Sequence, residues 1–314
     1  MLHVSGAIVQ TVIDPLSDVF SLTDMRSARC TRLEAGGGWA LSFPAKAALK
    51  FVAVLRGRCW LTLPGEAPHR LGQGDTFLLA NAPAYVIASD LDLAPEDGVP
   101  LFDGPHLDVA RYNGDDTALL GGAFVFDSGG AQLLLDALPP FIHIPASEPA
   151  AAVLRGTLEL LDAELQAAQM GASLMARRLG DVLLVQALRV FAARQGRDRA
   201  GWVVALADPK IGGALNLIHK DPGRRWTVDE LASAIGMSRS GFALRFKELV
   251  GLAPLDYLTR WRMQLAREAL RRKEASVASL AATLGYASES AFGNAFKRIF
   301  GRSPKRYWIS ERTA

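Results

Sequence analysis

The last third of the chain contains an internal repeat, and this repeat constrains the fold more than any other feature of the sequence. Residues 227–236 (TVDELASAIG) match residues 276–285 (SVASLAATLG) at a shift of 49, and residues 242–258 match residues 292–308 at a shift of 50. Two copies of one unit therefore follow each other and must fold alike. The identical positions are Val228/Val277, Leu231/Leu280, Ala232/Ala281, Gly236/Gly285, Phe242/Phe292, Phe246/Phe296, Lys247/Lys297, Gly251/Gly301, Pro254/Pro304 and Tyr257/Tyr307.

Each copy reads as two short helices around a tight turn. Gly236 and Gly285 are predicted to end the first helix, because glycine tolerates the left-handed conformation of many helix ends. Ser238 and Ser288 are placed to cap the second helix with their hydroxyl groups. This is the helix-turn-helix plan. The first helix presents one apolar face at helical spacing, formed in the first copy by Val228, Leu231, Ala232 and Ile235.

The segment between the copies predicts a rigid spacer. Residues 254–273 begin with a proline, which suits the first turn of a helix, and contain no helix breaker. Twenty helical residues span about 30 Å, and one turn of B-DNA spans about 34 Å. Such a spacer would place two recognition helices in successive major grooves. The alternative is a duplicated helical hairpin with no role in DNA binding.

The charge distribution favours DNA binding over that alternative. Residues 208–314 contain 19 Lys and Arg against 10 Asp and Glu, which gives a net charge of +9, whereas residues 1–207 carry −6. A basic region of this kind is the electrostatic footprint expected for a nucleic-acid partner.

Residues 210–308 resemble the DNA-binding domain of the AraC/XylS family of bacterial regulators. The resemblance rests on WTVDELASAIGMSRSGFALRFKELVGLAPLDYL, on RWRMQLAREAL, and on SVASLAATLGYASESAFGNAFKRIFGRSPKRYW. It implies seven helices in two subdomains, and transcriptional control through double-stranded promoter DNA. It also implies RNA polymerase as a partner if the chain is an activator.

The outward faces of the two recognition helices supply the candidate DNA-binding residues. Turning by 100° per residue away from the phenylalanine stripe places Asn294 outward, and its amide can bond an adenine edge. Leu244 offers only apolar contact, for example with a thymine methyl group. Longer basic side chains further along suit phosphate, and Arg239 can reach either target. The candidates are Arg239, Ser240, Leu244 and Lys247 in the first unit and Ser290, Asn294, Lys297 and Arg298 in the second.

The two recognition helices differ in the chemistry of their outward residues. Family members often carry a long polar or aromatic residue at the positions of Ser240 and Leu244, whereas this chain has a small and an apolar one. We therefore expect the second unit to dominate sequence discrimination.

The first part of the chain reads as short strands separated by turns rich in Gly, Pro and Asn. The strands LKFVAVL, CWLTLP, DTFLLA and AYVIAS begin near Leu49, and GGAFVFD (121–127) is a later one. This spacing is typical of a small antiparallel barrel. LRGRCWLTLPG and LGQGDTFLLANAPAYVIASD are similar to the cupin-type sensor domain of one branch of the AraC family.

The sequence thus predicts an α+β multidomain protein. We expect a cupin-like domain at 1–145, a helical connector at 146–205 and an AraC-type DNA-binding domain at 206–314. Helix-turn-helix units are expected at about 227–250 and 276–300. A GRDRAG segment (196–201) suits a linker.

A barrel with an apolar interior is a natural ligand pocket. Trp39, Phe51, Trp60, Phe77 and Tyr85 are the candidate lining residues, with plain core as the alternative. Many cupins are metal enzymes with an HxH pair, which is missing here, and the chain has five histidines. We therefore predict no catalytic residue, no metal ligand and no cofactor, and an unknown small-molecule effector.

Two cysteines, Cys30 and Cys59, are too few for a disulfide framework. They are read as small buried hydrophobes or, alternatively, as a redox pair.

Two helical runs lie between Pro149 and Arg194. The first has Leu154, Leu158, Leu161 and Leu165 at helical spacing, and the second has Val182, Val185, Leu188 and Val190. Packing onto the barrel is one interpretation, and homodimerisation through one of these helices is the other.

No signal peptide and no apolar run long enough for a bilayer are present, so we expect a cytoplasmic protein with no membrane partner. Three functions stay open: a transcription factor that responds to a small molecule or to redox state, a cupin-type metal-dependent enzyme fused to a DNA-binding domain, and an architectural DNA-binding protein.

Overall fold

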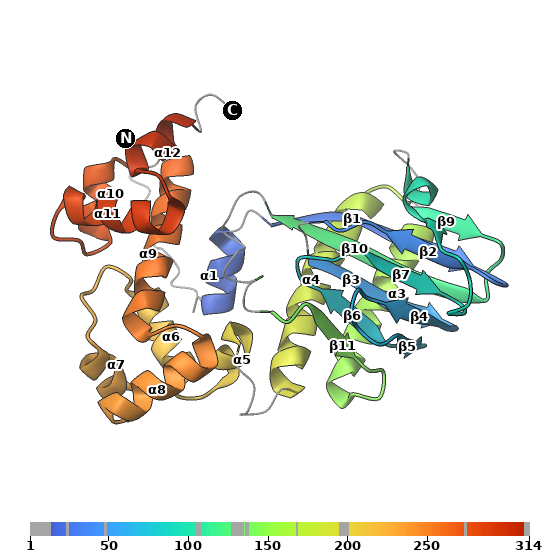
Figure 1. Ribbon diagram of the computed structural model, residues 1–314, viewed down its shortest axis with the longest axis horizontal. Helices are drawn as coiled ribbons and strands as arrows, with labels where there is room; N and C mark the ends of the chain where they lie inside the picture. The colour runs from blue at the N-terminus through green and yellow to red at the C-terminus, as the bar shows by residue number, and fades with distance from the viewer. Residues whose placement is uncertain are drawn as a thin grey trace, which may run out of the picture. The chain divides into compact units, whose positions relative to one another are not determined.

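The computed structural model describes residues 14–22, 25–46, 49–103, 108–126, 135, 138–167, 169–194, 201–272 and 275–310. The chain forms two compact units that do not follow chain order. One unit consists of Met25–Asp198 and holds the β-sheets; the other combines Met1–Asp24 with Arg199–Ala314 and holds helices (Figure 1). The chain therefore passes between the units twice.

A six-stranded sheet forms one layer of the first unit. The strand order is β11-β6-β3-β10-β1-β9, and all neighbours are antiparallel except β1 and β9. The strands are β1 (Met25–Ala35), β3 (Leu49–Arg56), β6 (Thr76–Leu79), β9 (Val109–Tyr112), β10 (Thr117–Phe126) and β11 (Phe141–Ile144).

A five-stranded sheet of order β5-β4-β7-β2-β8 forms the second layer. Its strands are β2 (Ala40–Phe43), β4 (Arg58–Thr62), β5 (His69–Gly72), β7 (Tyr85–Ala88) and β8 (Glu96–Asp97), and a short helix η1 (Val99–Phe102) follows. The predicted strands near 49, 59, 75 and 84 correspond to β3, β4, β6 and β7, so the cupin-like β fold is confirmed.

The two layers enclose one apolar core. Inward side chains of both sheets meet there because successive residues of a strand point to opposite faces. Core members include Leu33, Leu41, Val52, Leu61, Phe77, Ile87 and Leu119.

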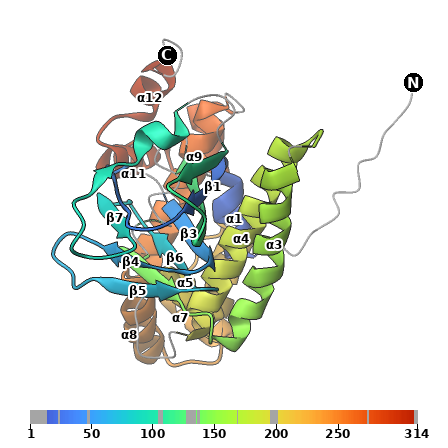
Figure 2. The ribbon, with the colours of Figure 1, turned by 90° about the vertical axis from the view of Figure 1, so that its right-hand side faces the viewer.

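Two long helices cover the outer side of the six-stranded sheet (Figure 2). They are α3 (Ala152–Ala167), preceded by the turn η3 (Pro149–Ala151), and α4 (Ala172–Arg194). In the first predicted apolar stripe Leu154, Leu158 and Leu161 are buried, and Leu165 is half-buried. The second predicted stripe is half right: Leu188 and Val190 are buried, whereas Val182 is 45% exposed. The other buried residues near the middle and end of α4 are Leu183, Leu184, Ala187 and Phe191.

The helical unit begins with α1 (Pro15–Leu22), which the sequence reading did not predict. Asp14 starts this helix, because its carboxylate accepts a hydrogen bond from the Ser17 N–H at 3.0 Å. Val19 is buried, and α1 contacts α5, α6 and α9.

From residue 211 onward the structure describes the seven helices implied by the resemblance. They follow α5 (Trp202–Ala207) and are α6 (Ile211–Lys220), α7 (Val228–Ala234), α8 (Arg239–Val250), α9 (Pro254–Arg271), α10 (Val277–Thr283), α11 (Glu289–Phe300) and α12 (Pro304–Ser310). The spacer helix α9 has 18 residues, or about 27 Å. It ends two residues before the predicted Lys273, which lies outside the described residues, as does most of the predicted linker at 196–201.

Candidate nucleic-acid interface and effector pocket

The turn between the two helices of each unit is built by the predicted residues. Gly236 and Gly285 have φ values of 64° and 75°, the left-handed conformation that favours glycine. The Ser238 hydroxyl accepts from the Gly241 N–H, and the Ser288 hydroxyl accepts from the Ala291 N–H. Both recognition helices, α8 and α11, therefore begin at a serine cap, as the sequence predicted.

The repeated aromatic residues fix each recognition helix to α9 or α12. In the first unit the Phe246 ring lies edge-on to Tyr257, with centroids 5.9 Å apart. In the second unit Phe296 and Tyr307 take the same arrangement at 5.7 Å. All four side chains are buried. The identities of the repeat are thus explained by two copies of one aromatic core, which leaves the opposite helix face to solvent.

The free face of α8 carries the predicted residues of the first unit. Ser240, Leu244 and Lys247 are exposed, and Leu244 reaches 62% exposure. Arg239 is exposed too, with its guanidinium 3.2 Å from the carboxylate of Asp229 in α7. An exposed leucine among these polar groups offers apolar contact.

The free face of α11 carries the predicted DNA-binding residues of the second unit. Ser290, Asn294, Lys297 and Arg298 are all exposed. The face therefore presents an amide, a hydroxyl group and two cations on one side of a helix. This is the donor and acceptor set that reads base edges and binds phosphate.

A buried arginine, missed by the sequence reading, ties the two helix-turn-helix units together. Arg262 of α9 is 9% exposed and donates hydrogen bonds to the carbonyls of Pro222 at 2.6 Å and Arg224 at 2.8 Å. Its guanidinium also lies 5.5 Å from the ring of Tyr286 in the second unit. The loop before α7 is thereby held against the second helix-turn-helix unit. The two units are therefore joined by the contacts of Arg262 as well as by the continuous helix α9.

The β sandwich contains a cavity of about 290 Å³ between its two sheets. Of the predicted lining residues, Phe51 and Tyr85 lie on its wall. Trp39 and Phe77 are not on that wall and belong to the core between the sheets, whereas Trp60 lies half-buried on β4. The sequence analysis did not identify four other residues of the wall, Lys50, Arg29, Phe43 and Phe102. A lysine within the apolar strand LKFVAVLR was the available signal.

Cys30 and Cys59 are free and buried, and they lie on strands of different sheets. Burial raises the pKa of each thiol to about 12, with a smaller contribution from nearby carboxylates. Both groups are therefore protonated at neutral pH, and thiol oxidation requires the thiolate.

Among the residues that the structure describes, no three His, Cys, Asp or Glu side chains gather as metal ligands. His3 and His106 lie outside those residues. In the same part of the chain, no helix is long and apolar enough to cross a membrane.

Both units match known families. Residues 14–193 match a family described as "Cupin", and residues 231–308 match one described as "Helix-turn-helix domain". Together with the paired helix-turn-helix geometry, these matches define a DNA-binding transcription regulator with a cupin domain. The chain belongs to the AraC-like family of transcription regulators.

Relatives that match almost end to end show this membership. A putative AraC-like transcription regulator of Streptomyces antibioticus is 44% identical over 94% of this chain and 98% of its own length. The HTH-type transcriptional regulator AlkR of Acinetobacter baylyi is 31% identical over 94% of this chain and 99% of its own. The solved DNA-binding domain of AdpA, in complex with a target DNA, is 31% identical and covers 34% of this chain and 95% of that one, with a TM-score of 0.32. Nothing among these relatives favours the enzyme alternative.

Proposed function

We propose that this regulator discriminates promoter sequences with its second recognition helix and uses the first chiefly as an anchor. The observation that carries this proposal is the difference between two exposed faces: α11 presents Asn294, whereas the equivalent position in α8 is Leu244. An amide can make two hydrogen bonds to adenine, and a leucine makes none. Lys247, Lys297 and Arg298 are proposed to bind phosphate, which sets position but does not read sequence.

The test begins with duplexes selected by the full chain from a random library, which defines its binding site. We expect Asn294→Ala to flatten the preference at one base pair and to cost about 1–3 kcal/mol on the selected site. Leu244→Ala is the matched control from the first unit and should change the preference less. If Asn294→Ala weakens binding to the selected and scrambled duplexes equally, Asn294 is not a base-reading residue.

We propose that a small molecule in the β sandwich controls this DNA binding and that the sandwich is a binding domain, not an enzyme. Support comes from the cavity between the sheets and from relatives that are named as transcription regulators over nearly their whole length. Because both thiols are buried and protonated, they favour a small molecule over a redox change as the controlling signal.

Homodimerisation through the connector helices is a further part of the proposal. Two apolar side chains of α3, Val153 and Leu160, are 60% and 61% exposed at a spacing of two helical turns. Helix α4 exposes Leu174, Met175 and Val182. Light scattering of Leu160→Asp and Val182→Asp variants would show which helix pairs: one variant should be monomeric. A dimer that survives both substitutions does not form through these residues.

Promoter DNA of bacteria lies in the cytoplasm, so we propose that the protein acts there. If it is an activator, it must also contact RNA polymerase. Transcription in vitro from a template with the selected site, with purified polymerase, tests this: a rise in transcript shows an activator, and a fall shows a repressor.

A further inference from the structure

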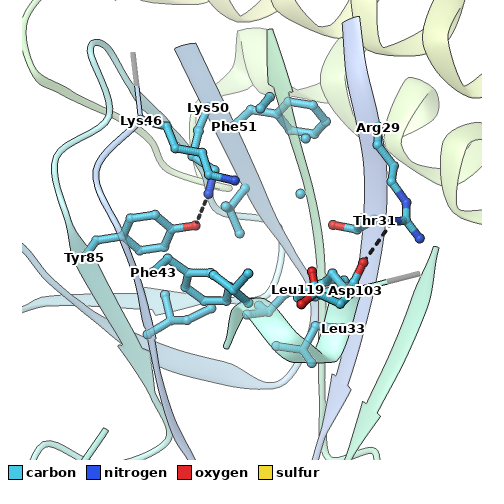
Figure 3. A pocket seen from close by; sticks show the side chains of 17 residues that line it. Arg29, Thr31, Leu33, Phe43, Lys46, Lys50, Phe51, Tyr85, Asp103 and Leu119 are labelled. Atoms are coloured by element: carbon cyan, nitrogen blue, oxygen red, sulfur yellow. Dashed lines mark hydrogen bonds between the residues drawn. The ribbon is translucent and has the colours of Figure 1, made fainter. Parts of the chain in front are cut away.

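The cavity of the β sandwich holds a lysine that no carboxylate neutralises within the described part of the chain. Lys50 of β3 is half-buried, and its Nζ donates a hydrogen bond to the Tyr85 hydroxyl at 2.7 Å (Figure 3). The same Nζ lies 4.7 Å from the ring centroid of Tyr85 and 5.2 Å from that of Phe43. Burial lowers the pKa of Lys50 to about 8, and the charge of Lys46 contributes.

The walls around this ammonium group are mostly apolar. Apolar side chains of β1, β3, β7 and β10 line the cavity, among them Leu33, Val52, Ile87 and Leu119. At Gly122 a side chain would collide with the Phe51 ring, since a Cβ there would lie 2.4 Å from Phe51 Cε1. The small residues of β10 thus leave room for the Phe51 ring, which is part of the wall. The volume of about 290 Å³ lies just below the usual range for ligand pockets, about 300–1,000 Å³, and therefore suits a small ligand.

Two further cations lie on the wall: Lys46, which is exposed, and Arg29, which is already neutralised. Its Nε donates to the Asp108 carboxylate at 2.5 Å and its Nη1 donates to the Phe102 carbonyl at 2.9 Å. Asp103 adds a negative charge at the same side of the cavity (Figure 3). An anionic ligand group is therefore favoured at the Lys50 side and disfavoured at the Asp103 side.

We propose that this cavity binds a small monocarboxylic acid with an apolar body, whose carboxylate contacts Lys50 and Tyr85. The Tyr85 oxygen accepts from Lys50, so the hydroxyl proton of Tyr85 is left to donate to the ligand. One carboxylate can thus take a charge-assisted hydrogen bond from Nζ and a second bond from the phenol. The apolar body fills the space between Phe43, Phe51 and Leu119. This inference rests on the proposed control by a small molecule and names its chemical class.

The experiment is calorimetric titration of the full chain with 4-phenylbutyrate and octanoate, each compared with its neutral amide. We expect each acid that fits to bind at least about tenfold tighter than its amide, a factor typical of one charge-assisted contact. At pH 8, binding should also take up about half a proton per acid, because a carboxylate raises the pKa of a lysine that is half protonated there. Titration in two buffers of different ionisation enthalpy measures this uptake.

Variants locate the site. Lys50→Met keeps most of the aliphatic stem and should abolish both the preference for acid over amide and the proton uptake. Lys50→Arg keeps the charge and should retain the preference. Arg70→Met, on the exposed side of β5, is the matched control and should behave as the parent chain. Circular dichroism confirms that each variant is folded.

The results separate the ligand class from the proposed control of DNA binding. Failure of both acids to bind the folded parent chain, or unchanged acid binding by Lys50→Met, overturns the carboxylate site and leaves DNA binding untouched. If acids bind through Lys50 but do not change the affinity for the selected duplex, the site stands and the effector role fails. Loss of the acid effect on DNA binding in Lys50→Met, with ligand-free affinity preserved, supports both.

Discussion

Asp18 Oδ2 lies 2.9 Å from Nδ1 of His219, so a carboxylate of α1 is paired with a buried histidine of α6. The other ring nitrogen, Nε2, lies 2.7 Å from the hydroxyl group of Tyr257, which accepts a further hydrogen bond from Trp202 Nε1 at 2.8 Å. In this chain of contacts the neutral imidazole donates to Asp18 and accepts from Tyr257. Helix α1 is thereby fixed to the first helix-turn-helix unit by a polar network.

This network predicts that the helical unit loses stability in mild acid. Burial lowers the pKa of His219 below its ordinary value of 6.5, although Asp18 and Asp14 act in the opposite direction. As the pH falls below 6.5, the unfolded chain takes up the proton first, so stability present above that pH is lost, at about 1.4 kcal/mol per unit of pKa difference. Hydrogen exchange in α6 and α9 at pH 7.5 and 5.5 measures the loss. His219→Gln should remove this pH dependence, and equal pH slopes in both proteins would refute it.

The two turn glycines should respond differently to the same substitution. Gly236→Ala introduces left-handed strain, and its new Cβ meets only the flexible end of Lys210 at 3.2 Å, so we expect a cost of about 1–2 kcal/mol. Gly285→Ala would also place its Cβ 2.0 Å from the Gly223 carbonyl oxygen, which adds about 1–3 kcal/mol of overpacking. Thermal unfolding should show a clearly lower midpoint for Gly285→Ala. Equal midpoints would mean that the loop at Gly223 moves away from the new Cβ at no cost in stability.

A phosphate contact by Lys297 predicts a change in salt dependence without a change in sequence preference. Lys297→Ala should weaken binding to selected and scrambled duplexes alike. The slope of log affinity against log salt should become shallower by about 1. Fluorescence anisotropy across a salt series measures both quantities. The exposed Lys305 on α12 is the comparison, and the proposal assigns it no phosphate contact. A selective loss on the selected duplex would make Lys297 a base-reading residue.

The buried thiols predict chemical inertness. Because the pKa values of Cys30 and Cys59 are raised to about 12, almost no thiolate exists at pH 8. Iodoacetamide should therefore modify both slowly in the native chain and rapidly in urea. DNA binding should be unchanged by dilute peroxide and by a Cys30→Ser/Cys59→Ser variant. Rapid native modification of either cysteine would restore the redox interpretation.

Local rules predicted the helical unit well. Serine caps, turn glycines and the spacing of Phe242 and Phe246 act within a few residues, so the sequence alone located α8 and α11 and their free faces. Helix α1 was not predicted because it is short and is stabilised by tertiary structure: Asp18 contacts His219, about two hundred positions away, and Val19 is buried.

The cavity could not be located in this way. Its walls come from strands that are distant in sequence: Arg29 of β1, Lys50 of β3 and Tyr85 of β7 meet only after both sheets have formed. Aromatic content pointed to Phe51 and Tyr85, which lie on the cavity wall, but it could not separate them from Trp39 and Phe77, since a wall residue and a core residue share the same hydrophobicity. The residue that distinguishes the cavity wall from the core is Lys50.

The two passages of the chain between its units have a topological consequence. The β sandwich is in effect an insertion between α1 and the rest of the helical unit, and it is tethered to that unit at both of its ends. A protease that cuts only the second connection would leave α1 covalently joined to the sandwich. Because α1 also contacts the helical unit through Asp18 and Val19, the two fragments should stay associated without a covalent bond.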